Sequence, residues 1–154
     1  MLSQLACSLR NYLTSIVNAV YPSKSAQEPS ENDEDDVVPT KMLLVVRDDL
    51  KMSKGKACAQ VGHAVLGVYK RALERRHNYL EQWETSGQPK IVTKIDSEGE
   101  MDTICALAEE KAIPTYITQD AGRTQVAPGS RTVLALGPAP VELIDSICGH
   151  LKLY

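Results

Sequence analysis

Three polar residues recur along one predicted helix at a spacing that places them on the same face. Lys56, Gln60 and His63 are separated by four and three residues, so the first and last return to nearly the same bearing at about 100° per residue. Most neighbouring positions are apolar, and a polar stripe on a largely buried helix needs partners or water. The lysine and histidine could bind an anion, stabilise an oxyanion or shuttle a proton. Alternatively, His63 is a structural histidine.

A second polar cluster lies between two apolar runs that predict strands at about 115–119 and 131–136. The connecting loop contains Asp120, Arg123 and Thr124, which suit a binding or catalytic loop. The glycines, proline and hydroxyl residues of the same loop also suit an ordinary hairpin connection. The residues of this loop alone leave both interpretations open.

The two clusters meet only if the fold brings them to one edge of a sheet. Lys54 and Lys56 lie in the first turn of the predicted helix, where free backbone N–H groups favour an anion, unless both are solvated charges. In a doubly wound sheet, this helix starts at the carboxyl end of the preceding strand, where ligands bind. If the strand at 115–119 is parallel to the first strand, it brings Asp120 to the same crevice.

The elements that must position these residues alternate between strands and helices. The predicted strands are 42–46, 89–95, 115–119 and 131–136, and the predicted helices are 53–84 with a break near 77–78, 97–111, and 141–151. Ser97 and Glu100 have the spacing of a capping box, and Gly137–Pro140 is predicted to end the fourth strand. This order predicts an α/β fold, a three-layer α/β/α sandwich with a four-stranded, mostly parallel (mixed) sheet.

Composition divides the chain into three parts. Apolar residues recur at helical spacing in residues 1–21, which predicts an amphipathic helix too short and too polar to span a bilayer. Residues 22–40 are acidic and lack hydrophobic periodicity, as expected of a disordered linker, and residues 41–154 form the predicted folded domain. The first segment could contact a membrane or a protein, or direct import into mitochondria. Without such a role the expected location is the cytosol.

Charge and cysteine usage narrow the classes of function further. The formal net charge is −3, but acidic residues gather before residue 40 and basic residues are in excess over 41–94, which suits a polyanionic partner. Solvated lysines and arginines on helix faces are the alternative. The four cysteines are far apart in the sequence, which argues against a zinc site and a disulfide scaffold, so we expect buried free thiols; they are Cys7, Cys58, Cys105 and Cys148.

Several motifs follow one another in residues 41–154. They are Lys41–Ala64, Gln88–Lys90, Gln119–Ser130, Thr132–Pro138 and Gly149–Tyr154. Together they resemble the type-2 peptidyl-tRNA hydrolases of archaea and eukaryotes. The resemblance implies hydrolysis of the ester bond between a peptide and the terminal ribose of tRNA, with no metal or organic cofactor. It also implies a four-stranded mixed sheet between helical layers, commonly in a homodimer.

The same resemblance implies roles for individual residues. The family's active-site lysine, histidine, aspartate and loop threonine correspond to Lys56, His63, Asp120 and Thr124, and a second threonine corresponds to Thr132. Asp120 is expected to orient or deprotonate a water, and Lys56 to stabilise the oxyanion. The candidates for substrate binding are Lys51, Lys54, Gln60, Lys90 and Arg123. Ser53 stands where many members have glycine.

Two other functions are compatible with the sequence. One is a membrane-associated scaffold or adaptor, which the amphipathic segment and the acidic linker motivate. The other is an RNA-binding module without catalytic activity. Release of free tRNA from an N-blocked aminoacyl-tRNA separates the hydrolase from both.

Overall fold

The computed structural model describes residues 38–122 and 126–154. The expectations for residues 1–21, for most of the linker and for Arg123 and Thr124 lie outside these residues. The elements in chain order are β1 (Thr40–Arg47), the 3-10 turn η1 (Asp48–Leu50), α2 (Lys54–Glu74), α3 (Leu80–Thr85), β2 (Lys90–Ile95), α4 (Glu98–Glu110), β3 (Thr115–Gln119), β4 (Arg131–Pro140), α5 (Val141–Cys148) and β5 (Lys152–Leu153). None of the described helices is long and apolar enough to cross a bilayer.

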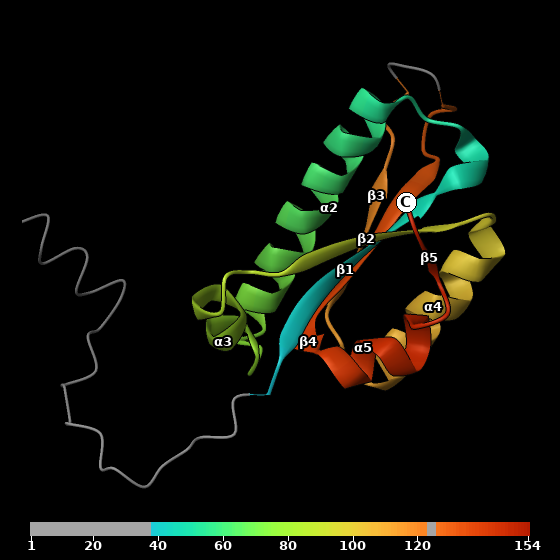
Figure 1. Cartoon of the computed structure of the whole chain (residues 1–154). Helices are drawn as coiled ribbons and strands as arrows, with labels where there is room; N and C mark the ends of the chain where they lie inside the picture. The colour runs from blue at the N-terminus through green and yellow to red at the C-terminus, as the bar shows by residue number, and fades with distance from the viewer. Residues whose placement is uncertain (1–37, 123–125) are drawn as a thin grey trace, which may run out of the picture. The chain divides into compact units, whose positions relative to one another are not determined.

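The strands form one mixed sheet in the order β3-β4-β1-β2-β5, between α2 and α3 on one side and α4 and α5 on the other (Figure 1). The predicted three-layer α/β fold is therefore confirmed, but the sheet has five strands rather than four. Only β1 and β2 pair in parallel, and the other three neighbouring pairs are antiparallel, so parallel pairing does not predominate.

The central strand β1 explains why both faces of the sheet are covered. Its side chains alternate between the two cores, as the period of two along a strand requires. Met42, Leu44 and Val46 pack into the core beneath α2 and α3, while Leu43 and Val45 pack against α4 and α5. A continuous apolar run is what a strand buried on both faces needs.

The ends of β4 and of the last helix, α5, differ from the predicted boundaries. β4 was expected to end at Gly137–Pro140 but continues to Pro140, because Ala139 and Pro140 pair with Lys41 and Thr40 beyond an irregularity in the register. The last helix ends at Cys148 rather than near Leu151, since the chain turns back and Lys152–Leu153 pairs with β2.

The helix boundaries of the long helical segment follow local signals. The expected break is present: α2 ends at Glu74, Arg76 has a left-handed backbone with φ 48°, and α3 starts at Leu80. The indole Nε1 of Trp83 then donates to the Pro89 carbonyl at 3.0 Å, which fixes the short helix to the start of β2. The predicted cap of α4 also forms, because the Glu100 N–H donates to Ser97 Oγ at 3.2 Å.

Strand direction places the candidate residues at one edge of the sheet. β4 is antiparallel to both β1 and β3, so β1 and β3 run in the same direction although they are not neighbours. Their carboxyl ends, at Arg47 and Gln119, therefore lie at the edge where the chain turns into α2 (Figure 1). Lys56 in the first turns of α2 and Asp120 just after β3 meet there.

Candidate active site

A buried ion pair joins the helix cluster to the loop cluster. Lys56 Nζ lies 3.1 Å from Asp120 Oδ1, and the two side chains are 8% and 7% exposed. Lys56 is the third helical residue after the N-cap Ser53, and Asp120 directly follows β3. Because a charge this far from solvent is costly without a partner, the two side chains hold each other in place.

A hydrogen-bonded chain extends from the ion pair into the core. Gln60 Nε2 donates to Asp120 Oδ1 at 3.4 Å, and Gln60 Oε1 accepts from Thr132 Oγ1 at 2.6 Å. Thr132 is fully buried, and the carbonyl of Thr118 is a second acceptor within 3.2 Å of its hydroxyl. Gln60 therefore contacts the carboxylate from within the protein, and Thr132 in turn holds the Gln60 amide.

The loop after β3 holds the other oxygen of Asp120. The Gly122 N–H donates to Asp120 Oδ2 at 3.0 Å, and the backbone closes through Asp120 N to Ser130 O at 2.9 Å and Gly129 N to Asp120 O at 2.8 Å. Gly122 has φ +75°, and a Cβ there would lie 2.4 Å from Pro128 Cγ. The base of this loop is thus closed like a hairpin, and the same closure orients the carboxylate.

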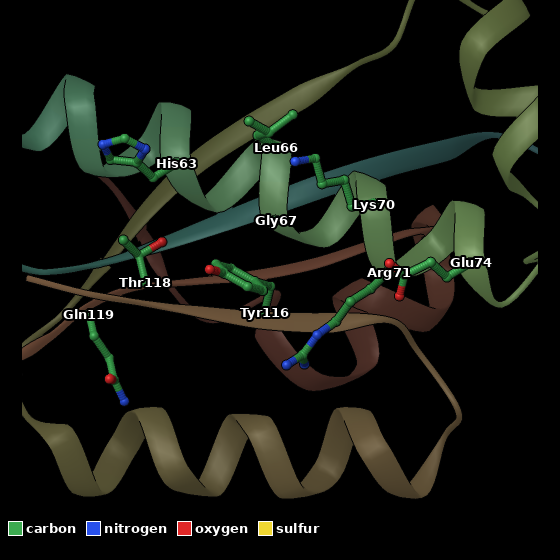
Figure 2. Close-up of a pocket in the computed structure, with 9 residues that line it drawn as sticks. All are labelled: His63, Leu66, Gly67, Lys70, Arg71, Glu74, Tyr116, Thr118 and Gln119. Carbon is green, nitrogen blue, oxygen red and sulfur yellow. The ribbon is translucent and has the colours of Figure 1, made fainter.

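His63 lies outside this network. It is exposed and lines a groove between α2 and β3 with a volume of about 530 Å³, together with Thr118 (Figure 2). Lys56, Gln60 and His63 do occupy one stripe of α2, but only the first two reach Asp120. The buried Thr118 hydroxyl has no hydrogen-bond partner among the residues that the structure describes.

The other basic residues proposed for substrate binding occupy different parts of the fold. Lys54 is exposed in the first turn of α2, and Lys51 is exposed and pairs with Asp48 at 3.2 Å. Lys90 starts β2 opposite Met42, at the other end of β1 from Arg47. Its ammonium lies 4.7 Å from the centre of the Trp83 ring. The structure therefore does not bring Lys90 to Asp120.

The structure adds two residues that the sequence patterns did not single out. Tyr116 and Thr118 precede Asp120 at intervals of two along β3, so all three face α2. That alternation was available in the sequence, because a strand ending one residue before Asp120 predicts the face of its neighbours. Of the three cysteines in the described residues, only Cys148 is buried as expected, since Cys58 is exposed and Cys105 is half-buried. Burial raises the pKa of the Cys148 thiol to about 11.

Arg47 connects the end of β1 to the elements around the site. Its guanidinium donates to both carboxylate oxygens of Asp49 at 2.7 Å and to Glu98 Oε2 at 3.0 Å. The hydrogen bonds from Arg47 to Asp49 lower the pKa of Asp49 below its ordinary value, against the opposing effect of partial burial. The turn η1, which leads into α2, is thereby fixed to the sheet.

Replacing Asp49 with asparagine is expected to lower the free energy of unfolding by about 1 kcal/mol at neutral pH. A lowered pKa in the folded state means that the unfolded chain binds more protons below about pH 4. The contribution of Asp49 is therefore complete above that pH and is lost as the pH falls further. Urea unfolding at several pH values measures the difference, with Asp96→Asn as the control. A difference that is constant down to pH 2 would contradict the linkage.

The carboxylate of Asp120 and the ammonium of Lys56 suit a reaction in which a water attacks and negative charge develops on the substrate. A carboxylate oriented by a backbone N–H can position a water or accept a proton, and an adjacent ammonium can stabilise negative charge that develops nearby. Within residues 38–122 and 126–154, no group of three or more His, Cys, Asp and Glu side chains is placed to hold a metal ion.

Comparison with known proteins assigns the fold to a family. Residues 40–154 match the family model described as peptidyl-tRNA hydrolase PTH2. A human relative named peptidyl-tRNA hydrolase 2, mitochondrial, is 52% identical over 114 residues, covering 74% of this chain and 64% of the human one. The mouse relative of the same name is also 52% identical, covering 74% and 63%. The chain thus matches less than two thirds of these relatives' length.

A shorter relative matches almost completely. The protein from Sulfurisphaera tokodaii named peptidyl-tRNA hydrolase is 48% identical over 118 residues, covering 74% of this chain and 98% of that one. A solved structure of a protein of unknown function from Agrobacterium has a TM-score of 0.49 at 14% identity, covering 75% of this chain and 97% of that one, a similarity too low to interpret. From the family model and these identities, the chain belongs to the peptidyl-tRNA hydrolase PTH2 family.

Proposed function

We propose that this protein hydrolyses the ester bond of peptidyl-tRNA and releases free tRNA and peptide, which recycles tRNA from aborted translation. The single observation that supports this most directly is the buried pair of Lys56 and Asp120, 3.1 Å apart at the carboxyl edge of the sheet. Family membership and the names of the human and archaeal relatives agree with it.

The proposed reaction uses an oriented water. Asp120 orients the water or takes its proton, with Thr124 as the partner that the family pattern adds. The water oxygen bonds to the ester carbonyl carbon, and Lys56 stabilises the negative charge on the carbonyl oxygen. The bond to the ribose oxygen then breaks, and that oxygen receives a proton as the tRNA leaves. His63, exposed in the groove between α2 and β3, is proposed to shuttle this proton or to hold the substrate.

Gln60 and Thr132 are proposed to act through Asp120. Both are buried, at 8% and 0% exposure, and each hydrogen-bonds to a protein group rather than facing the groove. We therefore assign them as positioning residues, in place of substrate binding for Gln60 and catalysis for Thr132. Lys54, Lys51, Lys90 and Arg123 remain candidates for contacts to the tRNA phosphates, which basic groups track regardless of base sequence.

One assay tests the proposed function. Purified full-length protein is mixed with an N-acetylaminoacyl-tRNA, and free tRNA is separated from charged tRNA over time. Release far above the uncatalysed rate is expected. Binding of the tRNA without release would instead indicate a non-catalytic RNA-binding module.

We further propose a homodimer and a location in the cytosol, with mitochondrial or membrane association through residues 1–21. The names of the human and mouse relatives support the mitochondrial association. Fluorescent fusions with and without residues 1–36 provide the test. Identical diffuse signals would reject targeting and anchoring, and a sedimentation experiment that finds only monomer would reject the dimer.

A further inference from the structure

The groove between α2 and β3 is lined from His63 to Glu74 on the helix and from Tyr116 to Gln119 on the strand, and the buried ion pair lies further along the same two elements. On α2, Lys56, His63 and Lys70 follow at intervals of seven and so lie on one side of the helix. Tyr116 and Thr118 share the face of β3 that lines the groove, and Asp120, two residues after Thr118 and just beyond the strand, also points to α2. The faces of α2 and β3 that line the groove therefore point, further along, to the same two charged groups, and Lys56 and Lys70 are about 21 Å apart along the helix axis.

Cationic groups line this groove away from the ion pair. Lys70 is exposed and has no ion pair with any residue in 38–122 or 126–154. Arg71 donates to the Thr115 carbonyl at 2.6 Å, and its guanidinium lies 5.2 Å from the centre of the Tyr116 ring (Figure 2). Glu74, at the far end, is the one acidic group among the residues that line it. Cations beside an aromatic ring are suited to a single-stranded nucleic acid.

The floor of the groove depends on a close approach of helix and strand. Gly67 lies above Tyr116, and a Cβ there would be 2.3 Å from Tyr116 Cδ1. The absence of this side chain lets the ring lie flat against α2, between His63 and Arg71 in the chain direction of the helix (Figure 2). The ring supports the Arg71 guanidinium, whose plane and charge provide a surface against which a base can pack.

We propose that this groove binds the single-stranded 3′ end of the tRNA, with its phosphates near Lys70 and Arg71. This deepens the proposed function and rests on it. The terminal ribose then reaches Lys56 and Asp120, and the peptide leaves the site on the side away from the groove. The peptide could instead pair with the free edge of β3, but Arg71 already occupies the Thr115 carbonyl on that strand.

The charge reversal Lys70→Glu tests the assignment, because this exposed side chain can change without disturbing packing. For N-acetylaminoacyl-tRNA we expect KM to rise about tenfold, kcat to stay within about twofold, and the slope of log KM against log salt to fall by about one. The dissociation constant of uncharged tRNA, measured by fluorescence, should weaken by the same factor. Lys111→Glu is the matched control, because Lys111 is also exposed but caps the end of α4 on the other face of the sheet.

A second substrate identifies which arm of the substrate lies in the groove. N-acetylaminoacyl-adenosine carries the same ester without the upstream phosphates, so the Lys70→Glu effect on KM should largely disappear with it. An effect that persists on this fragment and grows with peptide length would place the peptide in the groove and overturn the inference. Equal KM values for the Lys70→Glu and Lys111→Glu variants would also overturn it.

The two proposals fail in different ways. If wild-type protein releases no tRNA, the proposed hydrolysis is wrong, while the binding of uncharged tRNA still tests the groove. If wild-type protein is active and Lys70→Glu binds uncharged tRNA normally, only the groove assignment is wrong.

Discussion

Replacing Asp120 with asparagine is expected to reduce kcat for tRNA release by about 10³-fold and to change KM by less than about threefold. Asparagine has nearly the same shape and can still accept the Gly122 N–H bond, which is 3.0 Å long in the wild type. It lacks the negative charge and the ability to take a proton from water. Single-turnover release of tRNA from N-acetylaminoacyl-tRNA measures the chemical step directly.

The partner variant Lys56→Met separates catalysis from stability. A loss of about 10²–10³-fold is expected, because the ammonium that stabilises the oxyanion is removed. Asp120→Asn alone leaves a buried ammonium that is only 8% exposed without its carboxylate, which destabilises the fold. The double variant removes both charges, so it should regain stability in urea unfolding while its activity stays as low as in the worse single variant.

The control for these variants is Asp96→Asn, an exposed aspartate on the connection between β2 and α4. It should leave the single-turnover rate within about twofold of wild type, as expected of a surface substitution away from the site. Turnover by Asp120→Asn or Lys56→Met within threefold of wild type would reject the assigned roles. Recovery of activity in the double variant would do so as well.

The polar stripe of α2 shows which features of the site can be predicted from helical spacing. Spacing alone placed Lys56, Gln60 and His63 on one side of the helix, and the first two do face Asp120. His63 is exposed because β3 is the edge strand of the sheet, so a helix position turned slightly outward faces the groove beside it. The bearing of a residue on a helix does not reveal where the sheet beneath it ends.

The pairing of strands explains the other differences. Asp120 meets Lys56 because β3 runs in the direction of β1, which depends on β4 lying between them and is not encoded in either strand alone. β5 contains two residues, too few for any periodic pattern, and it exists only because the chain end meets β2. Lys90 was selected for its charge, and charge alone carries no information on which end of a strand it occupies.

Opposite effects on stability are expected from adding a methyl group at two glycines of α2. Gly62→Ala should raise the free energy of unfolding by up to about 1 kcal/mol, since alanine is the better helix former. No atom lies within 4 Å of a Cβ at that position. Gly67→Ala gains the same helix propensity but places its Cβ 2.3 Å from Tyr116 Cδ1 and 2.6 Å from Cγ. Because these ring atoms are close to the strand backbone, overpacking should dominate, with a net loss of about 1–3 kcal/mol.

The second-site variant Tyr116→Ala identifies the source of that loss. In the Tyr116→Ala background, the clash is absent, so Gly67→Ala should become as stabilising as Gly62→Ala in urea unfolding. The two glycine variants also test the groove. Gly67→Ala displaces the Tyr116 ring on which Arg71 lies, so KM for N-acetylaminoacyl-tRNA should rise. Gly62→Ala should leave KM unchanged. If Gly67→Ala is as stable as Gly62→Ala in the wild-type background, then α2 and β3 are not in close contact at this point. The groove would then lack the floor that Tyr116 provides, because the ring would be free to move away from the helix.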